Sequence, residues 1–139
     1  MEKKYYLSYK NIEPKNIELV RSLIKGGYYK KDVEGKREDI IKLVESFCEY
    51  YDIEVPEILF NKPTPCYDTI CNEIHLSNES IVSLLHEFKH CLQHIKQLKN
   101  TEDIARGWSL SLFYRASKNN FTKLAKEDKI LFVDKNDFK

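Results

Sequence analysis

Apolar side chains recur at every third or fourth position in four stretches of the chain, a spacing that places them on one face of a helix. The pattern predicts helices over residues 12–24, 38–51, 79–99 and 102–117. Pro14 suits the first turn of the first helix, where its missing N–H group would have no partner. We therefore expect helices to be the main elements of the fold.

Alternation of apolar and polar residues, the pattern of strands, lies between the second and third predicted helices. Residues 53–60 predict a strand, in which Pro56 is tolerated only near an edge or at the start. Residues 66–67 and 70–76 predict a hairpin. The expected fold class is therefore α+β, with a small, mostly antiparallel sheet packed on an active-site helix and two to three further helices.

Three further stretches have weaker patterns. Residues 28–37 are polar and predict a loop, whereas the aromatic residues 5–9 predict either a short edge strand or an arm. From Lys118 the chain is a charged tail, with a short strand or helix expected at 130–133. Specific functions are not indicated by any of these stretches.

The composition is that of one compact domain, expected over residues 1–139. Hydrophobic residues make up 42% and charged residues 32% of the chain, and 23 Lys and Arg residues face 22 Asp and Glu residues. This balance gives no electrostatic case for nucleic acid as a partner. No run of about 18 apolar residues is present, so no membrane partner is expected.

The N-terminal residues and the cysteines bear on the cellular compartment. Lysines near the start are not followed by a long apolar run, so no secretory signal is expected. Four cysteines stand at positions 48, 66, 71 and 91 without a C-x-x-C pair. We expect free, mostly buried thiols in a reducing cytoplasm, with a disulfide between Cys66 and Cys71 as the alternative. The cytoplasm would be that of the protein's own cell or of the host of a mobile element.

The segment His86-Glu87-Phe88-Lys89-His90 carries the chemistry, because it is an H-E-x-x-H motif within a predicted helix. Four residues advance slightly more than one helical turn, so both imidazoles lie on one face and can bind one metal ion. Glu87 would stand beside that ion and take a proton from a water molecule that the ion polarises. Lys89 is expected to face solvent. The motif thus predicts a metal-dependent hydrolase with zinc as cofactor.

A third ligand must come from outside the motif. His94 lies about 12 Å from His86 along the helix axis, too far for one ion to reach both without a break in the helix. Glu102 and Asp103 open the next predicted helix, and a turn at 100–101 would fold that helix back beside the first. Acids in a first helical turn also complement the helix dipole without any metal. Glu102 is the favoured ligand, with Asp103 and His94 as alternatives.

The order of these elements resembles the ImmA/IrrE-like peptidase domains and, more loosely, the SprT-like ones. The resemblance covers residues 38–117 and includes Glu102-x-x-Ala105-x-x-Trp108-Ser109, which is similar to the family's E-x-x-A-x-x-F-A pattern. Trp108 and Ser109 depart from the usual Phe and Ala, and His94 is an additional histidine. The resemblance implies a minimal zincin-like fold, one zinc ion held by His86, His90 and Glu102, and hydrolysis of a peptide bond in a protein or peptide substrate.

Two further expectations accompany this resemblance. A peptidase of this kind needs a donor for the negative charge that develops on the attacked carbonyl oxygen. The candidates are Tyr67, His75, Arg106, Tyr114 and Arg115, and spacing selects none of them. The alternative function is a non-catalytic metal-binding module, regulatory or interacting, on the same fold.

Overall fold

The structure is a computed structural model that describes residues 3–138, so the two ends of the expected domain, residues 1–2 and 139, lie outside the described residues. Five α-helices and three short strands form the described part of the chain. Their bounds are α1 Pro14–Lys25, α2 Val33–Tyr51, β1 Glu57–Leu59, β2 Cys66–Asp68, β3 Glu73–His75, α3 Ile81–Ile95, α4 Glu102–Ala116 and α5 Lys118–Lys126. The α+β class is confirmed, with one more helix than the upper number expected.

The sheet has the strand order β1-β3-β2 and is mixed. β3 pairs with β2 in the antiparallel direction, as the predicted hairpin requires, but β1 pairs with β3 in parallel. The expectation of a mostly antiparallel sheet is therefore wrong for β1. The cause is the proline-containing connection 60–65, which carries the chain past the position next to β1 and leaves that position to β3.

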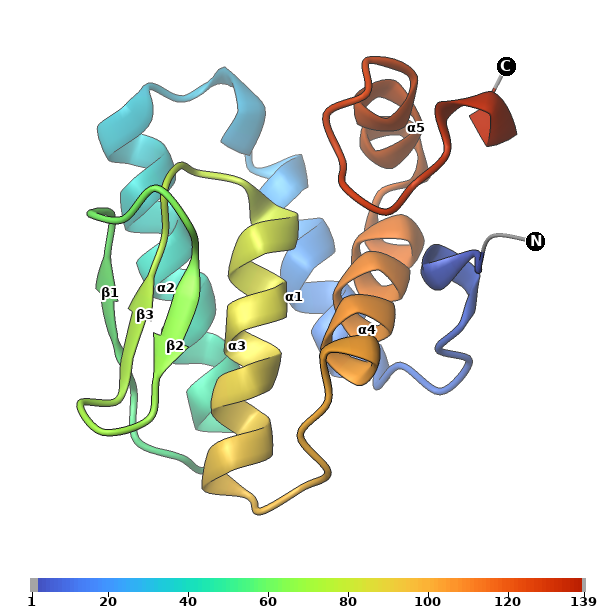
Figure 1. The fold of residues 1–139 in the computed structure, drawn as a ribbon. Helices are drawn as coiled ribbons and strands as arrows, with labels where there is room; N and C mark the ends of the chain where they lie inside the picture. The colour runs from blue at the N-terminus through green and yellow to red at the C-terminus, as the bar shows by residue number, and fades with distance from the viewer. Residues whose placement is uncertain (1–2, 139) are drawn as a thin grey trace.

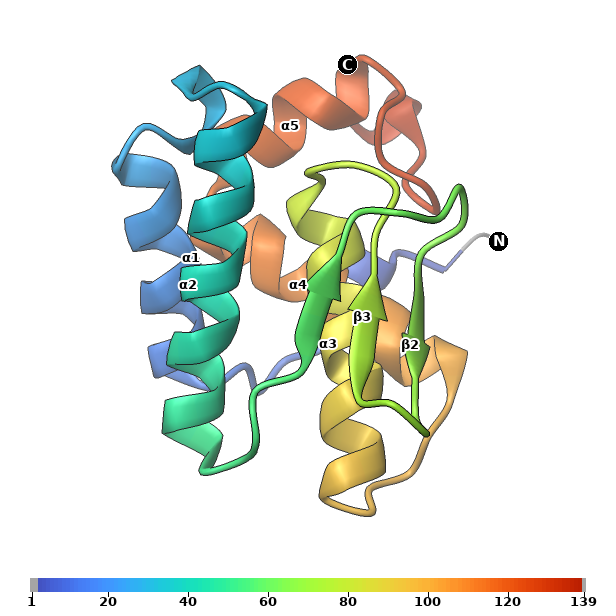
Figure 2. The same ribbon diagram turned by 90° about the vertical axis from the view of Figure 1, so that its left-hand side faces the viewer.

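Helix α3 covers one face of this sheet (Figures 1 and 2). Ile74 and Tyr67 are partners across β3 and β2, and Ile74 is fully buried on this face. In Figure 2 the opposite face of the sheet is turned to the viewer, and no helix lies in front of it. The sheet is thus packed on the helical layer from one side only.

Helix α4 lies at the centre of the helical layer, in contact with α1, α3, α5 and the N-terminal arm (Figure 1). Because α4 is surrounded by these elements, nearly every side chain from Ala105 to Phe113 is buried, including the polar Ser109 and Ser111. Ser111 donates a hydrogen bond to the Tyr5 carbonyl of the arm. Residues 5–9 therefore form an arm with a 3-10 turn at Tyr5–Leu7, and not an edge strand.

Several predicted boundaries shift. Helix α2 begins at Val33, five residues before the predicted start, because the Asp32 side chain caps it by accepting from the Gly35 N–H. The predicted loop 28–37 is shortened accordingly. Helix α3 ends at Ile95, before the predicted residue 99, and Gln97 beyond it has the left-handed φ of 53°.

The C-terminal region differs most from expectation. The charged tail contains a regular helix, α5, whose Phe121 and Ala125 are buried against the core. Residues 130–133 form neither a strand nor a helix. Within residues 3–138, no helix combines the length and apolarity that a membrane crossing would require. All four cysteines are free thiols, so Cys66 and Cys71 are not joined, and only Cys48 and Cys91 are buried.

Candidate metal centre

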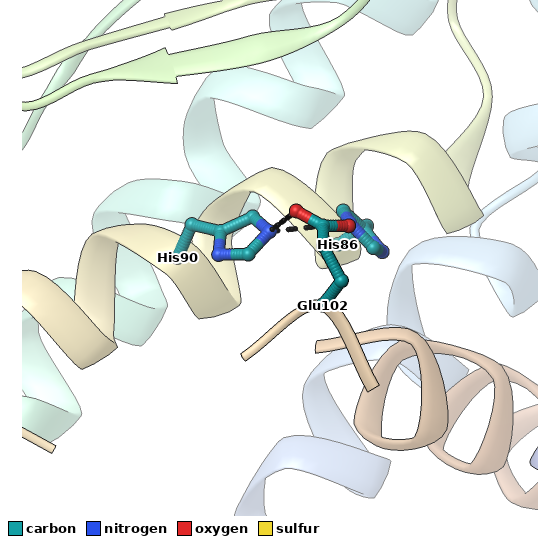
Figure 3. A group of neighbouring side chains, drawn as sticks. All are labelled: His86, His90 and Glu102. Carbon is teal, nitrogen blue, oxygen red and sulfur yellow. Dashed lines mark hydrogen bonds and ion pairs between the residues drawn. The ribbon is translucent and has the colours of Figure 1, made fainter. Parts of the chain in front are cut away.

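Helix α3 places His86 and His90 one turn apart on the face that points to the start of α4 (Figure 3). The helix begins where the Ser80 hydroxyl accepts from the Ser83 N–H, a side-chain cap that sets its first turn. The two imidazoles are half-buried beside the apolar face, with side-chain exposures of 20% and 14%. Their Nε2 atoms lie 3.2 Å apart. Both imidazoles thus lie on one face of the helix, as predicted, with their rings edge to face.

Glu102 is the first residue of α4 and closes the cluster from the facing helix (Figure 3). Thr101 caps α4 by accepting from the Ile104 N–H at 3.1 Å, and this cap fixes where the first turn begins. Glu102 Oε2 lies 3.0 Å from His86 Nε2, and Oε1 lies 2.8 Å from His90 Nε2. The donor atoms of all three residues lie within 4.8 Å of one another.

The outer nitrogen of His90 is held by two amide groups. Its Nδ1 lies 3.0 Å from both Gln93 Oε1 and Asn100 Oδ1. Because both partners are amide oxygens, Nδ1 carries a proton, and in the neutral imidazole Nε2 carries the lone pair. Histidines that bind metals are commonly oriented by such a bond from the other ring nitrogen.

The donor set fits a divalent cation. With its lone pair inward, His90 Nε2 faces a carboxylate oxygen and the second imidazole, so acceptors meet acceptors unless a proton or a cation lies among them. Two imidazole nitrogens and one carboxylate are a ligand set that suits zinc and leaves a fourth position open. The residues present therefore fit a zinc ion by the chemistry of their donors.

Glu87 stands beside this cluster with a buried carboxylate. Only 7% of the residue is exposed. Burial raises the pKa of Glu87 to about 7, with Glu102 adding to the rise and His90 opposing it. A carboxyl group with a pKa near neutrality can both accept and return a proton at ordinary pH.

Two of the proposed ligands, His86 and Glu102, have pKa values shifted from their ordinary ones. Burial lowers the pKa of His86, which favours its neutral form. Burial alone would raise the pKa of Glu102, but the neighbouring His90 and His86 outweigh it and hold this pKa below its ordinary value. Taken separately, the shift of His86 favours its neutral form and that of Glu102 favours its ionised form, and each is the form that binds a metal.

A cleft of about 1140 Å³ opens in front of the cluster. His86, Glu87, His90 and Glu102 all lie on its surface. One wall is the β1–β2 connection with the start of β2, and the opposite wall is the segment 129–132 after α5. This volume is ample for several residues of an extended peptide. Among the described residues, the N-terminal arm contributes nothing to its lining, so the arm does not cover the cleft.

The two alternative ligands lie outside the cluster. The Asp103 carboxylate accepts from Lys3 Nζ at 2.5 Å and from Tyr5 Oη at 2.8 Å, so it is bound to the arm and not to the two histidines. His94 is exposed in the last turn of α3, and its ring lies 6.1 Å from the ring of Tyr67. The helix continues unbroken through His90, which carries His94 away from the ion as the spacing predicts.

The candidate oxyanion donors separate into two groups. Tyr67 and Arg106 line the cleft. His75 does not, because it alternates with Ile74 along β3 and so points to the sheet face away from α3. Tyr114 packs between Tyr6 and Phe121 in the core. Arg115 is likewise outside the lining of the cleft. Of the five candidates, only Tyr67 and Arg106 therefore lie where a substrate in this cleft would meet them.

The expectation that Lys89 faces solvent is wrong, and the C-terminal wall of the cleft was not predicted. Lys89 is 9% exposed, with its ammonium group 5.0 Å from the Trp108 ring and 5.7 Å from the Tyr9 ring. Arg106 is similarly packed, 3.6 Å from the centroid of the Phe132 ring. The number of aromatic residues in the sequence does not indicate which lysine the N-terminal arm will cover. Phe132 lies in a segment without a periodic apolar pattern, so its position was not predictable either.

Searches of protein-family models, of curated proteins and of solved structures found no match to this chain. The resemblance to ImmA/IrrE-like peptidase domains therefore rests on the residues of the motif and on the order of the elements around it.

Proposed function

We propose that the chain is a zinc-dependent metallopeptidase of the zincin type, in which His86, His90 and Glu102 hold one zinc ion and Glu87 is the general base. One observation carries the proposal. Two imidazole nitrogens and a carboxylate converge within 4.8 Å on the surface of a cleft that the buried Glu87 also lines.

The chain's own residues account for the proton transfers. A zinc ion at this position would act as a Lewis acid toward a carbonyl oxygen and lower the pKa of water. Glu87 takes the proton from the attacking water and returns it to the leaving amine, a role that its raised pKa suits. Burial keeps competing water away from the carboxylate, so the proton remains available for the second step.

A peptide substrate suits the walls of the cleft. β2 is an edge strand of the sheet, and its Cys66 and Tyr67 line the cleft. An extended peptide could add to such an edge through backbone hydrogen bonds. The phenolic proton of Tyr67 is already given to Asn72 Oδ1 at 2.7 Å. Arg106, one turn after Glu102, is therefore the donor that we assign to the charge developing on the carbonyl oxygen.

The test begins with the purified chain, its zinc content and its action on a defined peptide library followed by mass spectrometry. Cleavage should require zinc and be lost on chelation. Glu87→Gln should keep the zinc affinity of the cluster and lose cleavage, whereas His86→Ala should lose both. The exposed Glu45→Gln is the control for loss of a carboxylate, and it should leave cleavage unchanged. Zinc-dependent cleavage that survives in Glu87→Gln would refute the assigned general base.

The same variant separates the alternative function from the proposed one. If a biological effect of the chain is unchanged in Glu87→Gln but lost in His86→Ala, the metal serves a non-catalytic regulatory or interaction module. The proposed setting is the cytoplasm, where the four free thiols would remain reduced.

A further inference from the structure

The sheet face away from α3 carries a row of carboxylates. Glu57 and Glu73 are partners across the β1–β3 ladder, and Glu73 and Asp68 are partners across the β3–β2 ladder. Adjacent strands lie about 4.8 Å apart, and like charges directly opposite each other destabilise a sheet. Among residues 3–138, no lysine or arginine forms an ion pair with any of the three. Within the described residues, the row is therefore not neutralised by a lysine or arginine in contact with it.

His75 lies on the same face, in contact with Glu73. It is 5% exposed, and its Nε2 lies 3.1 Å from Glu73 Oε1. Its Nδ1 lies 2.8 Å from Asn61 Oδ1, in the connection that forms one wall of the cleft. With Nδ1 donating to the Asn61 amide oxygen, Nε2 faces Glu73 either with the lone pair of a neutral imidazole, which a cation could occupy, or with the second proton of an imidazolium. The outer nitrogen of His75 is thus supported by an amide oxygen, as the outer nitrogen of His90 is.

Asp68 completes the group from the neighbouring strand. One of its oxygens, Oδ1, accepts from the Ile70 and Cys71 N–H groups at 2.9 and 3.1 Å, which orients the carboxylate. The second oxygen, Oδ2, takes part in neither of these two hydrogen bonds. One donor atom from each of Asp68, Glu73 and His75 lies within 4.8 Å of the other two. The group thus offers one imidazole nitrogen and two carboxylates, held by β2, β3 and, through Asn61, the loop.

We propose that Asp68, Glu73 and His75 form a second metal site that binds a divalent transition-metal ion, with zinc as the first candidate. One imidazole nitrogen and two carboxylates form a ligand set that is typical of binding sites for such ions. The cation would supply the positive charge that the row of acids lacks. It would also join three-residue strands whose few backbone hydrogen bonds give a small sheet little stability of its own.

The proposed role is structural and is separate from the proposed peptidase site. Pro63 and Pro65, in the same connection as Asn61, line the cleft. A metal at His75 would therefore hold the β2–β3 hairpin and the cleft wall in one arrangement. The proposal does not depend on the chain being an enzyme, because it concerns binding on the other face of the sheet.

The experiment uses the full chain carrying His86→Ala and His90→Ala, so that the first site is absent. The metal-free protein is titrated with zinc alone by calorimetry, and we expect one equivalent to bind. Asp68→Asn or Glu73→Gln, added to this background, should weaken that equivalent at least tenfold. Glu57→Gln is the matched control, because it removes the same charge from the same row without removing a donor of the group, and it should change the affinity far less.

Hydrogen exchange gives a second readout in the same background. Zinc should slow the exchange of amides in residues 66–75, and this protection should be lost in Asp68→Asn. Both acids are partly exposed, so these variants should fold even where a change at the buried His75 does not. Absence of zinc binding in the His86→Ala/His90→Ala chain would overturn the proposal. Equal weakening by Asp68→Asn and Glu57→Gln would also overturn it, because it would indicate unspecific attraction to charge.

Discussion

His90 Nε2 lies 2.8 Å from Glu102 Oε1, so a residue within α3 and the first residue of α4 meet across the helix pair. The contact depends on the connection 96–101, which ends in the Thr101 cap and starts α4 at Glu102. Asp103, one residue further, points around the helix to Lys3. A single position thus separates the metal-facing carboxylate from one that anchors the arm.

The first prediction uses this pair of neighbouring acids. Glu102→Gln should weaken zinc binding at the cluster by at least tenfold, because an amide is a poor replacement for an ionised ligand. Asp103→Asn is the matched control and should leave zinc affinity unchanged while loosening the arm. Competition with a chromophoric chelator measures both affinities. Equal losses in the two variants would mean that the charge at the start of α4, and not ligation by Glu102, governs binding.

The second prediction concerns the two amides that hold His90. Gln93 is 1% exposed and Asn100 is exposed, yet both accept from the same Nδ1–H. Gln93→Ala and Asn100→Ala should each reduce zinc affinity by about 10–100-fold, the usual effect of losing such a partner. Lys99→Ala, in the same connection but without contact to His90, should have no effect. Unchanged affinity in both amide variants would exclude this orienting role.

The sequence predicted the parts of this site that follow from spacing along one helix. His86 and His90 must share a face of α3 whatever surrounds them, and Glu102 follows a turn that folds α4 back. The side to which His75 points was not predictable, because it depends on the register of β3 and on which sheet face α3 covers. A correct strand assignment therefore left the role of His75 open.

Two misses have a different origin. α5 carries its apolar signal on Phe121, Leu124 and Ala125 alone, a signal too short to distinguish from a charged tail. Lys89 is covered by Tyr9 of the arm and Trp108 of α4, and burial of its ammonium group lowers the pKa of that group. Both outcomes depend on tertiary contacts between distant segments, which a periodic pattern does not contain.

The third prediction concerns pH and Glu87 in the metal-free chain. The folded-state pKa is about 7, raised from 4.5 by burial, so the folded state holds this proton more tightly than the unfolded state. Stability should therefore fall as the pH rises from about 4.5 to about 7, by on the order of 3 kcal/mol in all. Glu87→Gln should remove this part of the pH dependence and be the more stable protein at pH 8.

Urea denaturation of both proteins in the presence of a chelator, at pH 5 and at pH 8, measures the effect. The informative quantity is the difference in free energy of unfolding between wild type and Glu87→Gln at each pH. A difference that is the same at both values would show that the Glu87 carboxyl group is not destabilised by burial.

The fourth prediction tests Arg106 as the donor to the developing charge, and it rests on the proposed peptidase activity. Arg106→Gln should lower kcat by about 100-fold or more, with a smaller change in KM, because the interaction is made mainly in the transition state. Phe132→Ala removes the ring stacked on the guanidinium but keeps the charge, and should cost far less. Similar losses in the two variants would mean that Arg106 acts by packing the C-terminal wall.

The fifth prediction concerns Gly107, where α4 meets the arm. A Cβ atom at this position would lie 2.6 Å from Ser8 Oγ, whereas Ser8 Cβ would be 3.9 Å away. The hydroxyl cannot move freely, since it donates to the Tyr5 carbonyl at 2.8 Å. Gly107→Ala should therefore destabilise the wild type by displacing the arm, although alanine is favoured over glycine within a helix by about 1 kcal/mol.

Removing the hydroxyl should reverse the sign of this effect. In a Ser8→Ala background the new methyl group meets no oxygen, so Gly107→Ala should be neutral or stabilising by up to about 1 kcal/mol. Thermal unfolding of the four proteins forms a double-mutant cycle, and the two changes should show a clear coupling energy. An identical effect of Gly107→Ala in both backgrounds would mean that the arm does not approach α4 at this glycine. Because the arm also holds Asp103, release of the arm should be visible as faster hydrogen exchange at residues 5–9, while zinc affinity at His86 and His90 remains unchanged.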